Sequence, residues 1–335
     1  MTSQTIPQEA SFDQKLAFHL LHPRLPAVER RLLEIVGSDK SPAGELAAIV
    51  VKAGGKRIRP ALTLISSDFF KDNCDHEMTI DVASAIELIH MASIVHDDVI
   101  DGTSYRRKNR TLNAAFGNHV AILAGDLFLS KALAILSSHK KYEIINILAE
   151  TVTYMSEAEI EQSLRAFNDK VTEAEYNQYI GKKTAHLMAV SCYAGLLAAG
   201  ACEKAMSHMW HYGYYMGIAF QIIDDTLDLV GDQKTMGKTI WQDLPSGIIT
   251  LPVIKGLSHP KAGPFLSKLI HSRKFDHERM NRVREILLEI GAIEYAREQA
   301  RSYIRSAQER LMLMPPCEAR NKLFAISELS LQRNA

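Results

Sequence analysis

The stretch His90–Arg107, HMASIVHDDVIDGTSYRR, gives the most direct information about fold and chemistry. It continues an apolar segment, residues 82–95, whose length and composition predict a helix. The carboxylates of Asp97, Asp98 and Asp101 follow. Successive helical residues are rotated by about 100°, so the first and last of these carboxylates share one face. Three carboxylates at the end of a mostly buried helix are costly unless a cation lies between them.

The same DDxxD spacing recurs in the stretch 220–228, FQIIDDTLD, again behind an apolar segment, 212–220. It contains Asp224, Asp225 and Asp228. One such motif is explained equally well by a solvated helix end, but two copies predict two helices that face each other across a cavity. Because the motifs offer only oxygen ligands, without a His or Cys cluster that suits zinc or iron, they favour Mg²⁺.

Basic residues complement these acidic motifs. The stretch 54–60, GGKRIRP, combines two glycines with three cations, and Pro60 suits the start of a helix predicted for 61–70. Backbone N–H groups at a helix start, with Lys and Arg side chains, form an anion site. In isolation this stretch fits a solvent-facing turn. Beside metal-binding carboxylates it predicts a polyphosphate site. The cations available for phosphate are Lys56, Arg57, Arg59, Arg106, Arg107, Lys183 and Lys238.

Composition limits the class of protein. The chain has 335 residues, 47% of them hydrophobic, and a formal net charge of zero, which argues against a nucleic-acid binder that relies on phosphate contacts. Helical periodicity without strand-like alternation predicts an all-α fold, with one domain over 13–335 after an N-terminal arm, 1–12. The helical stretch 142–165 is expected to expose Glu157, Glu159 and Glu161.

The sequence also bears on location. Its four cysteines are scattered, so neither a zinc site nor a disulfide framework is expected. The N-terminus lacks the pattern of a signal peptide. The apolar runs 82–95 and 187–201 are shorter than the roughly 18 residues of a membrane span. We therefore expect a cytoplasmic protein without a transmembrane segment. A peripheral membrane contact, for release of product, is left open.

Metal ligands and cations, without a catalytic nucleophile set or a Walker motif, suit a reaction in which a diphosphate departs. Cations would stabilise the charge that develops on the leaving group. A carbocation left behind would need an apolar pocket that excludes water, and the apolar helices could supply its wall.

Several motifs occur together in a fixed order between about residue 45 and residue 255: GGKRIRP, HMASIVHDDVID followed by RR, KTA, FQIIDDTLD and GK…DL…TLP. In this the chain resembles the trans-isoprenyl (polyprenyl) diphosphate synthases. The stretches HMASIVHDDVID, EIEQ at 159–162 and KTAHLMAVSC are most similar to the large catalytic subunits of bacterial heptaprenyl diphosphate synthases. The resemblance implies an isoprenoid synthase fold of ten or more helices around a central apolar cavity.

The resemblance also implies residue roles. Mg²⁺, as three ions with substrate bound, would be held by Asp97, Asp98, Asp101, Asp224, Asp225 and Asp228. An allylic diphosphate of the farnesyl or geranylgeranyl type would contact Arg106, Lys183, Thr184, Gln221 and Lys238. Isopentenyl diphosphate would contact Lys56, Arg57, Arg59, His90 and Arg107, with Phe220 near its carbon chain. The catalytic set would be Asp97, Asp98, Asp101, Asp224 and Lys183. His90 could instead be an ordinary hydrogen-bonded core residue.

Product length follows from Ala92 and Ser93, one turn before the first motif. Short-chain members of the family carry aromatic residues there, so small residues predict a product beyond C20, about C30–C40, for example for a quinone side chain. The alternative is that these residues only permit helix packing. A homodimer, or a heteromer with a small subunit, is expected.

The chain departs from the family pattern at three places. One is the stretch 106–111, RRKNRT, where the family has RRGKPT. Ile248 replaces a usual lysine, which removes one cation and could make activity depend on a partner. Trp241 and Gln242 replace glycines, which would put a bulky ring near the mouth of the active site. A terpene cyclase and a regulatory subunit are the alternatives. Retention of the isopentenyl-site residues counts against the first, and both complete acidic motifs count against the second.

Overall fold

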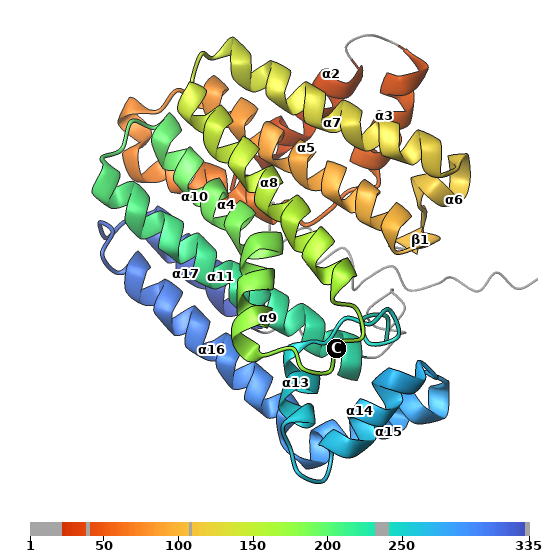
Figure 1. The fold of residues 1–335 in the computed structure, drawn as a ribbon. Helices are drawn as coiled ribbons and strands as arrows, with labels where there is room; N and C mark the ends of the chain where they lie inside the picture. The colour runs from red at the N-terminus through yellow and green to blue at the C-terminus, as the bar shows by residue number, and fades with distance from the viewer. Residues whose placement is uncertain (1–21, 38–40, 107–108, 232–240, 332–335) are drawn as a thin grey trace, which may run out of the picture. The chain divides into compact units, whose positions relative to one another are not determined.

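The structure is a computed structural model that describes residues 22–37, 41–106, 109–231 and 241–331. In these ranges the protein is all-α apart from one very short hairpin, which confirms the predicted fold class (Figure 1). The predicted arm 1–12, Arg107 and Lys238 lie outside the described residues. The helices are α2 (Leu25–Gly37), α3 (Pro42–Lys52), α4 (Ile58–Ser67), η1 (Asp68–Asn73), α5 (His76–Ile100), α6 (Leu112–Phe116), α7 (Asn118–Ser138), α8 (Tyr142–Leu164), α9 (Glu173–Ile180), η2 (Gly181–Ala185), α10 (His186–Ala198), α11 (Glu203–Val230), α13 (Leu251–Leu257), α14 (Gly263–Ser272), α15 (His277–Glu289), α16 (Ala292–Leu311) and α17 (Glu318–Leu331).

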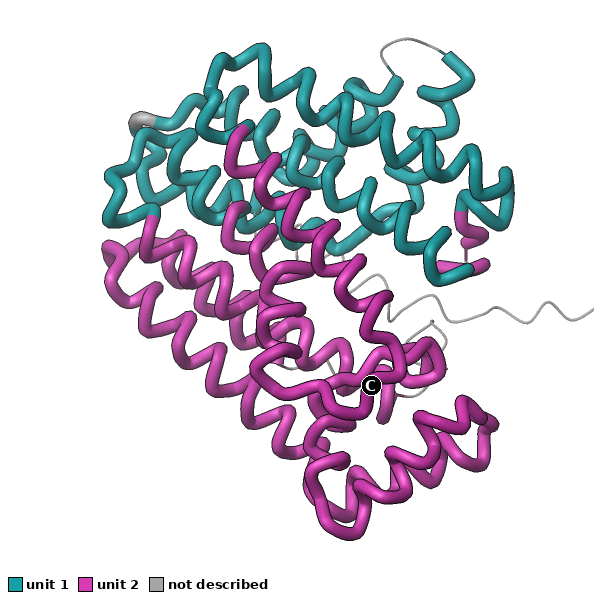
Figure 2. Tube along the Cα trace, viewed as in Figure 1, with its two compact units in different colours: residues 1–102, 112–145, 191–206 teal, residues 103–111, 146–190, 207–335 magenta. Residues whose placement is uncertain are grey.

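The chain divides into two compact units (Figure 2). Unit 1 comprises residues 1–102, 112–145 and 191–206, and unit 2 comprises residues 103–111, 146–190 and 207–335. The first aspartate motif belongs to unit 1 and the second to unit 2. The predictions that 13–335 form one domain and that the two motifs face one another therefore stay predictions.

Helix α5 is the core helix of unit 1. It begins at the N-cap Asp75, whose side chain accepts a hydrogen bond from the backbone of Met78. It packs against α2, α4 and α7. The predicted helix over 82–95 is confirmed and extends further in both directions. Two acidic residues buried in its first half pair with arginines: Asp81 bonds to Arg31 at 2.7 Å, and Glu87 bonds to Arg57 at 2.8 Å.

In unit 2 the central helix α11 approaches η2 and α10 closely. A Cβ added at Gly213 would lie 2.6 Å from the carbonyl oxygen of Met188, and one at Gly217 would lie 2.5 Å from the Cα of Ala185. Only glycine permits backbones this near. The C-terminal helices α13, α14 and α15 enclose a second apolar cluster, which includes Val253, Leu266, Ile270, Val283 and Leu287.

Within the described residues the strands are confined to a hairpin of β1 (Tyr105–Arg106) and β2 (Asn109–Arg110), antiparallel with Arg106 opposite Asn109. Each strand has two residues, too few for the period of two to show in the sequence.

Two helices are long and apolar enough to cross a membrane, judged by length and composition alone: α5 and α7. The apolar window of α5 is 78% buried in the structure, as expected of a core helix, and that of α7 is 39% buried. The segment 118–138 is a further apolar run, besides 82–95 and 187–201, on which the expectation of no membrane span was based. The absence of a membrane span stays a prediction.

Candidate active site

The first aspartate motif occupies the last turn of α5. Asp98 is buried, Asp97 is half-buried, and Asp101 is the exposed C-cap residue. The C-terminal end of a helix carries about half a negative charge, because its last carbonyl groups have no partner within the helix. Three carboxylates at this end repel both the dipole and one another. The donor set therefore fits a divalent cation with hard oxygen ligands, as the sequence predicted.

The predicted chain-length residues lie one turn earlier on α5. Ala92 is buried, and Ser93 is half-buried with its hydroxyl donating to the carbonyl oxygen of His90 at 2.9 Å. The serine hydroxyl is therefore bonded within its own helix, so this position adds little bulk or polarity to the wall beside it. His90 is half-buried, and its role in binding isopentenyl diphosphate stays a prediction.

The basic stretch 54–60 begins its helix earlier than predicted, since α4 starts at Ile58 rather than at residue 61. Arg57 is the N-cap residue, in the left-handed conformation with φ 50°. Its buried guanidinium donates to Glu29 at 2.8 Å, to Glu87 at 2.8 Å and to the carbonyl oxygen of Val51 at 2.9 Å. These contacts occupy the side chain and speak against the predicted binding of substrate by Arg57.

Arg59 has the opposite character. Its Nε is buried and has no hydrogen-bond partner among the described residues. Burial lowers the pKa of Arg59 to about 10, against the opposing effect of the Glu87 charge. A buried guanidinium N–H without an acceptor is costly, and an anion would relieve that cost. This observation fits the predicted diphosphate contact. Lys56, three residues before Arg59, is half-buried.

The second aspartate motif belongs to α11. Asp224 is half-buried, and Asp225 is buried. Both carboxylate oxygens of Asp225 accept hydrogen bonds of 2.7 Å, one from the Tyr176 hydroxyl and one from the Gln221 amide. The Gln221 carbonyl in turn accepts from Thr184 at 2.7 Å. The sequence did not predict Tyr176. These neutral donors speak against the predicted metal-ligand role of Asp225.

Burial raises the pKa of Asp225 to about 6, while the hydrogen bonds from Tyr176 and Gln221 lower it. Burial, together with the Asp225 charge, also raises the pKa of Tyr176 well above its usual value, so its hydroxyl remains a donor.

Asp228 anchors the loop that follows the undescribed residues 232–240. Its carboxylate accepts from the backbone N–H of Gln242 at 3.0 Å and of Asp243 at 3.2 Å. Trp241 adopts φ 59°, which explains why the family pattern has glycine there. Its ring packs against the C-terminal apolar cluster and His277, and its Nε1 donates to the carbonyl oxygen of Leu229. The ring thus packs on the core of unit 2, and its expected place near the mouth of the active site stays a prediction.

The lysines of the KTA motif pair with the glutamates of α8. Lys182 bonds to Glu157 at 3.1 Å and to Glu161 at 2.9 Å, and Lys183 pairs with Glu159. The hydrogen bonds that Lys182 donates to Glu161 and Glu157 raise its pKa. The prediction that these three glutamates lie on an exposed face therefore missed their ion pairs with Lys182 and Lys183. Lys183 lies in η2, a π-helical turn that interrupts the regular helix. Such turns are frequent at functional sites.

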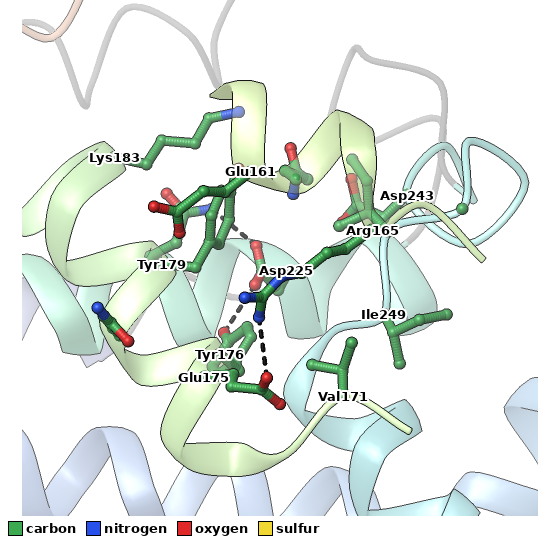
Figure 3. Close-up of a pocket in the computed structure, with 15 residues that line it drawn as sticks. Glu161, Arg165, Val171, Glu175, Tyr176, Tyr179, Lys183, Asp225, Asp243 and Ile249 are labelled. Carbon is green, nitrogen blue, oxygen red and sulfur yellow. Dashed lines mark hydrogen bonds and ion pairs between the residues drawn. The ribbon is translucent and has the colours of Figure 1, made fainter. Parts of the chain in front are cut away.

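A cavity of about 110 Å³ opens in unit 2 between α8, α9, α11 and the loop 243–249 (Figure 3). Figure 3 shows Arg165 reaching across it to Glu175, with which it forms an ion pair of 2.8 Å. Ile248 lines this cavity, so the lysine missing from the family pattern leaves an apolar wall. The other lining residues are Glu161, Gln162, Val171, Tyr176, Gln178, Tyr179, Lys183, Gln221, Asp225, Asp243, Gly247 and Ile249.

The remaining predicted site residues lie as follows. Arg106 is exposed on β1, and Phe220 is half-buried on α11. Across the described parts of the chain, no three His, Cys, Asp or Glu side chains converge as a ready-made metal cage. That is compatible with Mg²⁺, which is usually bound through one or two carboxylates together with substrate phosphates.

Comparison with known proteins agrees with these features. The family model described as polyprenyl synthetase matches residues 42–287. Heptaprenyl diphosphate synthase component 2 of Bacillus subtilis is 36% identical over 314 residues, covering 94% of this chain and 89% of that protein.

Two solved structures are also similar. The crystal structure of heptaprenyl diphosphate synthase from Staphylococcus aureus has a TM-score of 0.88 at 30% identity, covering 94% of this chain and 99% of that one. A polyprenyl synthase from Caulobacter crescentus, complexed with calcium and isoprenyl diphosphate, has a TM-score of 0.89 at 28% identity, covering 98% and 100%. The matched family model and the relatives of this identity show that the chain belongs to the polyprenyl synthetase family and is a prenyltransferase.

Proposed function

We propose that the protein condenses isopentenyl diphosphate with an allylic diphosphate, of the farnesyl or geranylgeranyl type, to make a long-chain polyprenyl diphosphate of about C30–C40 with Mg²⁺ as cofactor. The observation that carries the proposal is the last turn of α5, where three carboxylates gather at the negative end of a helix. This arrangement needs a divalent cation, and a diphosphate would complete the coordination of that cation.

The protein's own residues would bind and orient the two substrates. Asp97, Asp101 and Asp224 would hold Mg²⁺, which supplies positive charge against the departing diphosphate. Lys183 and the Gln221 amide would bind oxygens of that diphosphate. Arg59, whose Nε is buried without a partner among the described residues, would bind isopentenyl diphosphate. Bond formation at the isopentenyl double bond then leaves a proton to be lost, and the departed diphosphate is the nearest base in such a site.

The test of the reaction class is diphosphate release with the allylic substrate, measured with and without isopentenyl diphosphate. Elongation predicts release only with both substrates. Release with the allylic substrate alone would indicate a cyclase. Asp97→Ala and Asp224→Ala should each lower turnover by about two orders of magnitude or more without unfolding the protein, because each would remove a metal ligand. A fully active variant would contradict the assignment.

The small residues Ala92 and Ser93 support the proposed product length. Ser93→Phe should shorten the product, because an aromatic ring at this level of α5 would stop the growing chain. Ile89 lies one turn further from the motif and is buried, so Ile89→Phe is a control that changes the same helix away from this level. Products of unchanged length from Ser93→Phe would indicate that this serine serves helix packing alone.

We also propose association with a second protein chain through α7, either another copy or a smaller subunit, and a cytoplasmic location. The outward side of α7 exposes Ile122, Leu123 and Leu133, which are 45%, 54% and 46% accessible. Light scattering on Leu123→Glu should show dissociation if this side is an interface. A peripheral contact with membrane, for product release, would instead appear as reduced binding of this variant to lipid vesicles.

A further inference from the structure

A chain of three hydrogen bonds connects a buried tyrosine to the predicted substrate contacts of unit 2. The Tyr176 hydroxyl donates to Asp225, the Gln221 amide donates to Asp225, and Thr184 donates to the Gln221 carbonyl, each at 2.7 Å. These residues come from α9, α11 and η2. In Figure 3 Tyr176 points from α9 toward Asp225, at one wall of the cavity.

The chemistry of these groups fixes the direction of each bond. An ionised carboxylate can only accept, so Tyr176 must donate to Asp225 and the Gln221 nitrogen must face it. The Gln221 carbonyl then faces Thr184. The Gln221 nitrogen carries a second N–H, and this is the group that can meet an oxygen of the allylic diphosphate. With the amide reversed, a carbonyl oxygen would take that place and repel the anion.

Because Tyr176 and Asp225 are buried, the orientation of the Gln221 amide depends on the hydrogen bond between them. Tyr176 is 3% exposed and Asp225 is 8% exposed, so bulk water has little access to replace a lost donor. Without the tyrosine hydroxyl, the carboxylate would have one oxygen without its donor. It could then turn away from Gln221, and the amide would no longer have a single preferred orientation.

We propose that Tyr176 is a positioning residue for the allylic site: through Asp225 it holds the Gln221 amide with an N–H toward the diphosphate. The inference rests on the proposed function, which gives Gln221 its substrate. The competing explanation is that Tyr176 only satisfies a buried carboxylate and contributes to stability alone.

The experiment is a double-mutant cycle with Tyr176→Phe and Gln221→Met, the second of which keeps the side-chain length and removes the amide. Steady-state kinetics gives KM for each substrate. Titration calorimetry with inorganic diphosphate and MgCl₂ gives a binding constant that does not depend on turnover. Tyr212→Phe is the matched control, because its hydroxyl also makes a buried bond of 2.7 Å in unit 2, to the carbonyl oxygen of Leu323, outside this chain of bonds.

If Tyr176 acts through Gln221, Tyr176→Phe should lower kcat/KM for the allylic substrate about tenfold, the effect of one hydrogen bond to a charged group. It should leave KM for isopentenyl diphosphate within about twofold, because the cations predicted to bind the diphosphate of that substrate, such as Lys56 and Arg59, have no part in this chain of bonds. In the Gln221→Met background the same substitution should change kcat/KM less than about twofold. Tyr212→Phe should lower the melting temperature and leave the kinetics unchanged.

An equal loss from Tyr176→Phe in both backgrounds would overturn the inference, as would no loss in the wild-type background. If Tyr176→Phe does not fold, Asp225→Asn takes its place in the cycle, with the same non-additivity expected. A raised Mg²⁺ requirement in Asp225→Asn would make Asp225 a metal ligand and also overturn the inference. Diphosphate release by the wild-type protein from the allylic substrate alone would refute the proposed function, and the diphosphate binding constants would then decide the coupling between Tyr176 and Gln221.

Discussion

Replacing Arg57 separates a structural role from a substrate-binding one. The guanidinium is 3% exposed and holds Glu87, which is 4% exposed, and Glu29, which is 26% exposed. Arg57→Met would leave Glu87 as a buried carboxylate without its main cationic partner. Breaking a buried pair in this way costs about 3–5 kcal/mol. Summing the separate hydrogen bonds would overestimate the effect, because they share one desolvation cost.

The assay has two parts. Thermal unfolding should show a midpoint lower by roughly 10 °C, from the usual few degrees per kcal/mol in a protein of this size. Kinetics below that midpoint should show KM for isopentenyl diphosphate within about twofold of wild type, because the side chain faces carboxylates rather than substrate. The double variant Arg57→Met with Glu87→Gln should recover part of the stability that Arg57→Met loses, since the second substitution removes the uncompensated charge.

The contradicting result is equally clear. A variant with unchanged stability and a KM for isopentenyl diphosphate raised tenfold or more would place Arg57 on the substrate, as the sequence predicted. The same result would refute the view that its carboxylate partners occupy it.

Two further predictions follow from particular contacts. Burial raises the pKa of Asp68, but bonds and charges from His22 and Arg24 outweigh burial and leave it below the usual value. The stability that this carboxylate contributes should therefore be present above pH ~4 and be lost as pH falls through its lowered folded-state pKa. Asp68→Asn should reduce the stability of the protein at pH 7. If the substitution destabilised the protein as much in strong acid as at pH 7, the prediction would be contradicted. Gly125→Ala would put a Cβ 2.1 Å from Nε2 of His96, so it should lower the stability of the protein by about 1–3 kcal/mol. It should also lower activity, because it would shift the turn of α5 that precedes the first aspartate motif. Unchanged turnover in a destabilised variant would show that the turn tolerates the shift.

The sequence was sufficient for the parts of the fold that depend on local pattern. Apolar periodicity over 82–95 predicted the helix that became α5, and the Ser41–Pro42 pair marked the start of α3, where Ser41 accepts from the backbone of Gly44. Two acidic motifs and ordered basic stretches predicted the family. These signals are short-range, so they survive without knowledge of tertiary contacts.

The sequence was insufficient where a residue's partners lie far along the chain. Arg57 looked like a phosphate ligand because nothing local shows that Glu29 and Glu87 enclose it. Asp225 looked equivalent to Asp224, although adjacent helical residues point about 100° apart and only Asp225 meets Tyr176.

The contact of Trp241 with His277 could not be predicted either, because the two residues are distant in sequence. In each case a tertiary contact bears on the role of the residue, and no periodicity or motif spacing reports such a contact. One hint was available for Trp241, since a residue that replaces a glycine must tolerate a positive φ, as it does here.

Mass spectrometry of the products most directly tests elongation to a long prenyl chain. The purified protein would be incubated with Mg²⁺, isopentenyl diphosphate and farnesyl diphosphate. The account predicts a ladder of products separated by one five-carbon unit and ending in one polyprenyl diphosphate beyond C20, about C30–C40. Cyclic hydrocarbons, or a product that ends at C20 or below, would contradict it.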